Sequence, residues 1–355
     1  MTSILPDTVA SVLPDTVTSL LPDTVKPATL LSRRFRTETL PDLSGRVVVV
    51  TGGSAGIGFY DALALAKVGA TVIIISANEQ KGKDAEAEIN KQLKEVTSYG
   101  SVTWHGLNLQ NLKEVDKLAK QLAGELDRLD IFIANAGIGQ APYGLTDDGL
   151  ERHFEVNNLS HYVLILRLLP LMKKTAQTAP PTSVRIVMQS SMMHEFAPGG
   201  VKFLSKEEIN DDKPDGAQLY ARTKLGNILF AKELAKRHLT DTEKPILAIS
   251  VHPGTVDTEV QGAWSETYGV LGKILEQGSK LFGKTAFEGA EASLWAAAST
   301  DIFEGNWKDY QGKYFTEPYG TPDQETDQAK SQELATNFWN LSTRLTREIL
   351  GEELS

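Results

Sequence analysis

The sequence predicts an α/β fold built on a doubly wound, mostly parallel sheet with helices on both of its faces. From Arg46 onward, short apolar segments alternate with helical ones, which is typical of parallel sheets. A glycine-rich turn at residues 51–58 joins the first apolar segment to the first helix. Polar residues follow other apolar segments, among them Asn135, Ser191 and His252. Because parallel strands end at one edge of a sheet, where ligands bind, these residues are expected to share one site.

The individual elements follow from composition and spacing. Short runs of Val and Ile predict buried strands, and longer segments with apolar residues three or four apart predict helices. The first helix is expected to pass through Leu65 and stop at Gly69, because glycine is favoured just past a helix end. The six expected strands are residues 47–50, 72–76, 102–107, 131–135, 184–189 and 246–251. The other expected helices are residues 81–99, 112–126 and 154–172, and one that contains Tyr220.

Residues 1–42 are expected to form an arm, and residues 43–355 a single domain. The arm repeats Leu-Pro-Asp-Thr-Val at residues 5–9, 13–17 and 21–25, with a period of eight residues. This period is too short for a solenoid unit, and the proline in each copy prevents a continuous helix. Two interpretations stay open: an arm that docks its Leu and Val residues on this subunit or a neighbour, or a largely unstructured tail.

Composition excludes several classes of function. A net charge of −10 argues against binding to nucleic acid or to anionic membranes. The absence of cysteine excludes disulfides, thiolate catalysis and cysteine-based metal sites, and the six histidines are too scattered to predict a metal site. The longest apolar runs are far shorter than the ~20 residues of a membrane span, and no secretory signal is recognised. The protein is therefore expected to be soluble and cytoplasmic.

Tyr220 and Lys224 lie one helical turn apart and form the most informative pair in the chain. A phenol has a pKa of about 10, so it is a poor acid–base group near neutrality. An ammonium one turn away favours the phenolate and is expected to move this pKa toward the working pH. Such pairs are common by chance. Downstream of a glycine-rich turn, an Asn-Ala-Gly at residues 135–137 and the pair Ser190–Ser191, this one predicts a nicotinamide site with a phenol as proton donor.

Over roughly residues 43–344 the chain resembles the short-chain dehydrogenase/reductase family, and within it the branch of retinol dehydrogenases and WW-domain oxidoreductases. Residues 51–58 match the family's Thr-Gly-x-x-x-Gly-x-Gly, and residues 135–137 match its Asn-Ala-Gly. Residues 253–258 match Pro-Gly-x-Val-x-Thr. The resemblance implies a Rossmann fold and an NAD(P)(H)-dependent alcohol dehydrogenase or carbonyl reductase.

The resemblance also assigns four catalytic roles. Tyr220 is expected to be the general acid in carbonyl reduction and the base in alcohol oxidation. Ser191 is expected to hydrogen-bond the substrate oxygen and stabilise its developing charge. Lys224 would lower the pKa of Tyr220 and bond the nicotinamide ribose, and Asn157 would hold a water in the proton relay.

The cofactor is expected to be NADP(H), with NAD(H) left open. NAD(H) users of this branch carry an acidic residue just past the second strand, and NADP(H) users an arginine, but this chain has Ser76, Ala77 and Asn78 there. The absent acid leaves room for the 2′-phosphate, which Lys81 or Lys83 could reach. The expected cofactor-binding residues are Thr51, Gly52, Ser54, Gly56, Ile57, Gly58, Ser76, Asn108, Leu109, Asn135, Ala136, Gly137, Tyr220, Lys224, Pro253, Gly254, Val256 and Thr258.

The substrate is expected to be a lipophilic ketone, aldehyde or alcohol, because methionine and aromatic residues are predicted around the site. A lid is predicted at about residues 259–284, and residues 197–217 are predicted to form a solvated rim. His194 is interpreted either as a contact to a substrate oxygen or as a loop histidine bonded to backbone. The candidate substrate residues are Ile138, Gln140, Met193, His194, Phe196 and Trp264.

Two other functions stay open at this point. One is a scaffold that senses the dinucleotide without turnover, and the other is a dehydratase or epimerase on the same fold. Four catalytic residues together argue against the scaffold, since a sensor would not need them. A small-molecule substrate is expected in every enzymatic case, and assembly into a homo-oligomer is left open.

The repeat segment leads to a first prediction. Deletion of residues 1–25 removes none of the proposed catalytic groups, so hydride transfer to a small test substrate should survive. Any effect should fall on thermal stability or assembly size, because docking would contribute apolar burial at about 25 cal/mol per Å². Complete loss of activity in a truncated protein that still folds and binds cofactor would place the arm in the active site instead.

Overall fold

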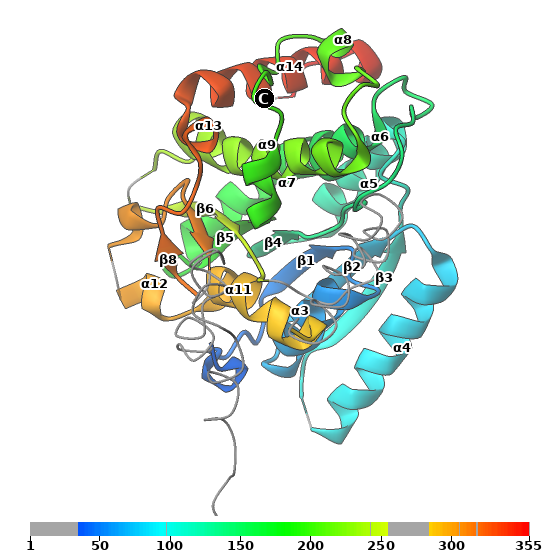
Figure 1. The fold of residues 1–355 in the computed structure, drawn as a ribbon. Coiled ribbons are helices and arrows are strands. Elements are labelled where there is room, and N and C mark those ends of the chain that lie inside the picture. Colours follow the sequence, from blue (N-terminus) through cyan, green and yellow to red (C-terminus); the bar gives the residue numbers. More distant parts are fainter. Residues whose placement is uncertain are drawn as a thin grey trace, which may run out of the picture.

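The computed structural model describes residues 35–96, 98–241, 243–254, 284–304, 306–316 and 319–354. Within these residues it shows a central sheet with helices on both faces (Figure 1). The strand order is β3-β2-β1-β4-β5-β6-β7-β8, and every neighbouring pair is parallel except β7–β8. The predicted doubly wound α/β fold is therefore confirmed. The strands are β1 (Val47–Thr51), β2 (Thr71–Ser76), β3 (Ser101–Gly106), β4 (Ile131–Ala134), β5 (Val184–Gln189), β6 (Ile246–Val251), β7 (Tyr314–Thr316) and β8 (Thr321–Pro322).

The helices form two layers around this sheet. One face is covered by α3 (Gly56–Lys67), α4 (Glu79–Glu95) and α11 (Ala286–Ala298). The other face is covered by α5 (Leu112–Glu125), α7 (Ser160–Thr178) and α9 (Gly216–His238), with α14 (Gln332–Leu350) packed outside α9 and α5. The shorter elements are η2 (Thr37–Thr39), α6 (Arg152–Phe154), η3 (Glu155–Leu159), η4 (Met192–Phe196), α8 (Lys206–Ile209), α12 (Asp301–Glu304), η6 (Trp307–Asp309) and α13 (Asp327–Lys330).

Strand β1 shows why the sequences of the central strands are unbroken runs of apolar residues. Val49 packs in the core under α5, α7 and α9, whereas Val48 and Val50 pack in the core under α3 and α11. All three side chains are fully buried. Successive side chains of a strand point to opposite faces, so a sheet covered on both sides needs apolar residues at every position.

The sheet order reverses at β1, and this reversal positions the site. β2 and β3 lie on one side of β1, and β4 lies on the other. Chain connections therefore leave β1 and β4 toward opposite sides of the sheet, which opens a crevice at their carboxyl ends. Thr51 and Asn135, which end these two strands in the sequence pattern, face each other there.

Most predicted elements are confirmed, and the differences have simple physical causes. The six predicted strands agree with β1–β6 to within one residue at each end. β7 and β8 were not predicted, because three and two residues are too few for a periodic pattern. The helix expected at residues 154–172 is divided into α6, the π-helical turn η3 and α7, and α4 ends at Glu95 rather than at residue 99.

The prediction of a solvated rim at residues 197–217 is wrong for part of that segment. Phe203 is fully buried, with its ring centroid 5.3 Å from that of Phe338 in α14. The segment folds inward because the Glu208 carboxylate accepts three consecutive backbone N–H groups, those of Lys202, Phe203 and Leu204. This carboxylate satisfies backbone groups that an apolar loop would otherwise leave unpaired.

The described chain begins within the segment expected to be an arm. Phe35 is only 5% exposed, and its ring centroid lies 5.4 Å from that of Tyr319. Leu40 is also buried in the core beneath α3 and α11. The repeats at residues 5–25 lie outside the described residues, as do most of the lid at 259–284 and the candidate residues Val256, Thr258 and Trp264.

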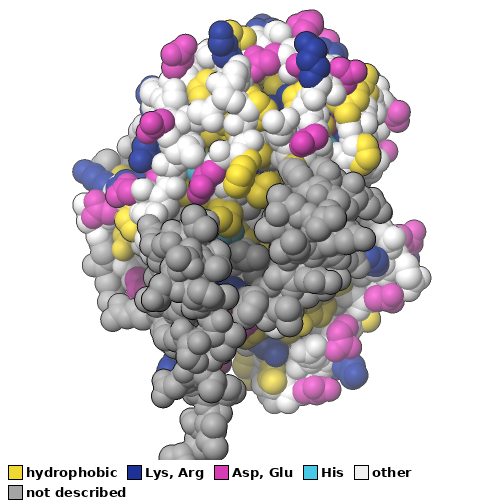
Figure 2. Space-filling model, in the orientation of Figure 1, with side chains coloured by type: hydrophobic (Ala, Val, Ile, Leu, Met, Phe, Trp, Pro, Cys, Tyr) yellow, Lys and Arg dark blue, Asp and Glu magenta, His cyan; other side chains and the backbone are white. Residues whose placement is uncertain are grey.

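The described surface has a mixed charge pattern. Acidic and basic side chains are intermingled over the described part of the face shown in Figure 2, without a basic stripe. Among the described residues, no helix is both long enough and apolar enough to cross a membrane.

A buried carboxyl group joins α3 to α11. Asp61 is fully buried, and its Oδ1 lies 2.6 Å from Ser293 Oγ, which also lies 3.0 Å from the Ala290 carbonyl oxygen. Burial raises the pKa of Asp61 to about 8, partly opposed by the hydrogen bond to Ser293. Ser293 has a single hydroxyl proton and two acceptors beside it, which fits a neutral Asp61 that donates one of these bonds.

We predict that Asp61→Asn makes the protein less sensitive to high pH. The carboxyl loses its proton near pH 3.8 in the unfolded chain and near pH 8 in the folded one, so native stability falls as the pH rises between these values. The amide does not titrate, so the melting temperature of the variant relative to the parent should increase by about 2 °C per pH unit over this window. Thermal melts from pH 5 to pH 9 measure the difference.

The control is Asp84→Asn, which removes a carboxyl from the exposed face of α4. Its melting temperature relative to the parent should stay constant with pH. If the melting temperature of Asp61→Asn relative to the parent also stays constant with pH, Asp61 is ionised in the folded protein.

Candidate active site

The glycine-rich turn between β1 and α3 leaves backbone exposed where side chains would normally stand. Gly52 and Gly56 have φ of 69° and 56°, a conformation that favours glycine. A Cβ on Gly58 would lie 2.5 Å from Asn135 Nδ2, so no larger residue fits there. Helix α3 starts after Ala55 without a side-chain cap. Its first amide groups are therefore available to an anionic group, as a dinucleotide pyrophosphate requires.

Thr51 connects this turn to the Asn-Ala-Gly segment. Its Oγ1 accepts the backbone N–H groups of Asn135 (3.1 Å) and Ala136 (3.0 Å). The Asn135 amide in turn donates to the Thr51 carbonyl oxygen at 3.0 Å. These bonds hold the ends of β1 and β4 together. The cofactor residues expected at 51–58 and 135–137 thus lie side by side.

His161, which the sequence did not single out, completes this contact. Its Nε2 lies 2.8 Å from Thr51 Oγ1, and its Nδ1 lies 3.1 Å from the Asn157 carbonyl oxygen. A carbonyl only accepts, so Nδ1 donates and Nε2 accepts from the Thr51 hydroxyl. Burial lowers the pKa of His161 to about 4, which keeps the ring neutral. The spacing of four residues from Asn157 was the available signal, since such residues meet on one helix face.

Asn157 lies in the π-helical turn η3 and faces the loop at residues 137–141, which holds the candidate substrate residues Ile138 and Gln140 (the substrate loop). Its Oδ1 accepts the Ile138 N–H at 2.8 Å, and its Nδ2 donates to the Ile138 carbonyl oxygen at 3.0 Å and to Thr223 Oγ1 at 2.9 Å. Thr223 Oγ1 donates to the Tyr220 carbonyl oxygen at 2.7 Å. The Asn157 side chain therefore links the loop after Gly137 to the helix that carries Tyr220.

The structure brings Ser191, Tyr220 and Lys224 together at the carboxyl end of β5. Tyr220 and Lys224 come from α9, and the Lys224 ammonium lies 5.2 Å from the centroid of the Tyr220 ring. Ser191 follows β5, and its hydroxyl interacts with the Tyr220 phenol. Lys224 Nζ donates to the backbone carbonyl oxygen of Gln189 at 2.9 Å. The lysine is thereby held beneath the phenol rather than hydrogen-bonded to it.

The acid–base properties of this group differ from the expectation. Burial raises the pKa of Tyr220 above its ordinary value, and the interaction with Ser191 opposes this only in part. Burial also lowers the pKa of Lys224 to about 8. From the sequence, the Lys224 ammonium is expected to lower the pKa of the Tyr220 phenol toward neutrality. In the structure the cost of burying a phenolate is larger, so Tyr220 is protonated across the neutral range.

Ser76, expected from the family resemblance to influence cofactor preference, ends β2 and has a partner that the sequence did not indicate. Trp104 in β3 donates its indole N–H to Ser76 Oγ at 3.0 Å. A Cβ on Gly82 of α4 would lie 2.1 Å from the same indole nitrogen, so glycine makes room for the ring. Asn78 caps α4 by accepting the Lys81 N–H at 2.9 Å.

Other expected cofactor residues lie along the same edge. Asn108 is exposed, and its Oδ1 accepts the Gln110 N–H at 3.1 Å. The Leu109 carbonyl oxygen accepts from Ser160 Oγ at 2.6 Å. Pro253 and Gly254 are buried directly after β6, and Gly254 has a φ of 87°.

The candidate substrate residues divide into two groups. Ile138 and Gln140 lie on the loop after Gly137, where Gln140 is buried and its Oε1 has no partner among the described residues. Met193 and Phe196 lie on η4, and Phe196 is 61% exposed. Both pairs follow strand ends at the edge that holds Tyr220.

His194 is bonded to backbone on both sides of its ring. Its Nδ1 lies 2.8 Å from the Ser191 carbonyl oxygen, and its Nε2 accepts the Thr326 N–H at 3.3 Å. The ring is buried, and burial lowers its pKa. The structure therefore favours the interpretation of His194 as a loop histidine over a contact to substrate.

Comparison with known sequences gives consistent results. Residues 46–201 match the family model described as short chain dehydrogenase. The bli-4 oxidoreductase of Neurospora crassa, whose name assigns it to mitochondria, is 35% identical over 324 residues, which cover 90% of this chain and 75% of bli-4. Human retinol dehydrogenase 14 is 30% identical over 310 residues, which cover 84% of this chain and 86% of that protein.

Solved structures share the fold. A protein of unassigned function from Mycobacterium paratuberculosis has a TM-score of 0.65 and 28% identity, over 91% of this chain and 100% of that one. A Beutenbergia cavernae structure, described as an NAD(P) dependent gluconate 5-dehydrogenase with bound NADP, has a TM-score of 0.56 and 20% identity, over 78% and 96% of the two chains. At that identity the second likeness shows the fold alone.

Proposed function

Because this chain is an oxidoreductase of the short-chain dehydrogenase/reductase family, in its retinol dehydrogenase branch, we propose that it interconverts a hydrophobic ketone or aldehyde and its alcohol. The observation that carries this proposal is the grouping of Tyr220, Ser191 and Lys224 beside the uncapped start of α3 and the Asn-Ala-Gly segment. Such a grouping provides a proton donor, a donor for a developing oxyanion and a buried cation in one place.

The residues present fit a nicotinamide dinucleotide. Gly52, Gly56 and Gly58 let the backbone approach a pyrophosphate, and the first turn of α3 offers amide groups to its charge. When bound, the reduced nicotinamide supplies the hydride that the protein itself lacks.

In the proposed reduction, Tyr220 transfers its phenolic proton to the carbonyl oxygen as the carbonyl carbon accepts the hydride. Ser191 donates a hydrogen bond to the same oxygen, and Lys224 stabilises the phenolate left on Tyr220. Because burial raises the pKa of Tyr220, the proton to be donated is present on the phenol at neutral pH. Alcohol oxidation uses the same atoms in reverse and needs the phenolate.

The substrate class is argued from the walls of the site. Ile138, Met193 and Phe196 offer apolar surface on the two loops that flank Tyr220. Methionine adapts to irregular shapes, which suits a lipophilic carbonyl compound. Retinol dehydrogenase 14 acts, by its name, on a substrate of this chemical class.

We favour NADP(H) over NAD(H) as the cofactor. No carboxylate stands at the end of β2 to repel a 2′-phosphate, and Ser76 can still donate its own proton while accepting from Trp104. Lys83 is paired with Glu79 at 2.6 Å, so a role in phosphate binding would require it to leave this partner.

Several other assignments stay proposals. We assign catalysis to the domain at residues 43–355 and no chemistry to the arm at residues 1–42. The cytoplasmic location and a homo-oligomeric assembly also stay predictions from the sequence.

We predict that Tyr220→Phe keeps the fold and dinucleotide binding but lowers turnover about a hundred- to ten-thousand-fold, because the ring still packs while the proton donor is gone. Turnover is measured with a panel of ketones, aldehydes and alcohols, and dinucleotide binding by titration. The matched control is Tyr162→Phe, which removes a buried phenol bonded to Thr343 at 2.8 Å, away from the site. Undiminished turnover in Tyr220→Phe would reject the mechanism and favour a different chemistry on this fold.

We predict that the unmodified protein binds NADPH more tightly than NADH, though modestly, because the described residues offer no arginine fork at Ser76 and Ala77. Ala77→Arg should widen the preference through a bidentate charged contact, and Ser76→Asp should reverse it. Binding titrations with both cofactors measure the preference. Because Ser76→Asp also disturbs the bond from Trp104, Trp104→Phe is the control. Much tighter NADH binding to the unmodified protein would show that the assignment is wrong.

A further inference from the structure

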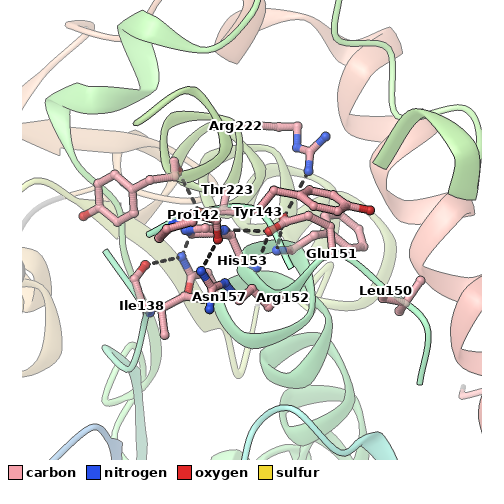
Figure 3. Close-up of polar contacts among 12 residues, drawn as sticks. Ile138, Pro142, Tyr143, Leu150, Glu151, Arg152, His153, Asn157, Arg222 and Thr223 are labelled. Carbon is pink, nitrogen blue, oxygen red and sulfur yellow. Dashed lines mark hydrogen bonds and ion pairs between the residues drawn. The ribbon is translucent and has the colours of Figure 1, made fainter. Parts of the chain in front are cut away.

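The substrate loop is fastened at two successive residues. Asn157 binds both backbone groups of Ile138 (Figure 3). The Nε2 of His153 lies 2.9 Å from the carbonyl oxygen of Gly139. Gln140 follows directly. The loop that provides one wall of the proposed substrate site therefore has little freedom to shift beside Tyr220.

The contact between His153 and Gly139 depends on a buried carboxylate. Glu151 is fully buried, and four nitrogen atoms lie within hydrogen-bond distance of its oxygens. Oε1 accepts from the backbone N of His153 (2.9 Å) and lies 2.6 Å from His153 Nδ1. Oε2 accepts from the backbone N of Phe154 (3.1 Å) and from Arg222 Nη2 (3.2 Å). Two backbone N–H groups and the Arg222 guanidinium can only donate, so three of the four contacts to Glu151 are certain donors and one of these is a cation.

The ionisation of Glu151 agrees with this geometry. Burial alone would raise the pKa of this carboxyl, but the hydrogen bonds and charge of His153 and the charge of Arg222 outweigh burial and hold it below its ordinary value. Glu151 is therefore ionised and pairs with the Arg222 cation.

The geometry also determines the protons on His153. Its Nδ1 faces the Glu151 carboxylate, and its Nε2 faces the carbonyl oxygen of Gly139. Neither partner can donate, so both ring nitrogens must carry hydrogen. A fully buried imidazolium results, which needs the adjacent carboxylate for its stability.

Arg222 ties this pair to the catalytic helix. It lies two residues after Tyr220 on α9, and Figure 3 shows it reaching Glu151 while Thr223 reaches Asn157. Arg222 also donates to the carbonyl oxygens of Ile209 (2.9 Å) and Glu208 (3.3 Å), and the charges of Glu208 and Asp211 act on it. Adjacent residues of α9 thus hold the loop at both points: Thr223 acts through Asn157, and Arg222 acts through Glu151 and His153.

We propose that Glu151, His153 and Arg222 form a positioning group, in which a doubly protonated His153 holds Gly139 and so sets the substrate wall at Ile138 and Gln140. None of the three contacts the reacting atoms. Their effect on substrate binding rests on the function proposed above, whereas the protonation of His153 and the rigidity of the loop do not.

The first test needs no activity. Nitrogen-15 NMR of the unmodified protein at pH 7.5 should show protons on both ring nitrogens of His153 and on only one nitrogen of His161. A single protonated nitrogen on His153 would overturn the proposal. This outcome is independent of whether the protein turns over any substrate.

The second test uses His153→Phe, which keeps a ring but removes both donors, and His153→Gln, which can serve only one acceptor well. Hydrogen exchange of residues 137–141 should accelerate at least about tenfold in His153→Phe, since a hydrogen bond to a charged group is lost. With an identified substrate, KM should rise by a similar factor, while kcat and the Kd of the dinucleotide change less than about twofold. The exchange rate and KM of His153→Gln should lie between those of His153→Phe and the parent.

His238→Phe is the control, because His238 stacks on Trp339 far from the loop. It should leave both exchange and KM unchanged. The positioning role would be overturned if hydrogen exchange in His153→Phe is unchanged, or if the Kd of the dinucleotide rises by as much as KM. If His153→Phe does not fold, Arg222→Lys replaces it, since a single ammonium cannot reach Glu151 and both carbonyl oxygens. An absence of turnover in the parent would reject the proposed function but leave the NMR and exchange tests intact.

Discussion

The hydroxyl of Thr51 is the interaction on which the rest of the site depends. It accepts two backbone amides from the end of β4 and meets His161 of α7, so one oxygen joins both strands at the crevice to a helix on one face of the sheet. His161 continues the chain of bonds to the Asn157 carbonyl oxygen, and the Asn157 side chain continues it to the loop and to α9. The proposed cofactor side and the proposed proton-transfer side of the site are therefore parts of a single hydrogen-bond network.

This network is polar and buried, and its members satisfy one another. Thr51, Asn157 and His161 are all fully buried, yet each hydrogen-bonding atom discussed above has a partner. Groups of this kind cost free energy when unpaired, so their pairing defines one arrangement of the loops instead of many. Tyr220 and Ser191, to which we assign the chemistry, are only partly buried and stand at its margin.

Much of the fold, and the placement of Tyr220 beside Lys224, could be predicted from the sequence, because both depend on local patterns. Runs of Val and Ile fixed the six strands, and the four-residue spacing placed Tyr220 and Lys224 on one face of α9. The contacts between distant segments could not be predicted. Trp104 reaches Ser76 across a strand pair, and Arg222 reaches Glu151 across 71 residues of chain. The pKa of Tyr220 was misjudged for the same reason, since burial depends on tertiary packing.

The π-helical turn η3 controls the rotational phase of α7. A π turn holds one more residue than an α turn, and each residue advances a helix by about 100°. The extra residue therefore sets the direction of α6, before the turn, relative to α7, after it: His153 meets Gly139, while α7 faces its apolar residues to the sheet and His161 to Thr51. A continuous α-helix through residues 155–159 would keep the second arrangement only by turning α6 about 100° away from the first. The number of residues in η3 is consequently as strongly constrained as their identity.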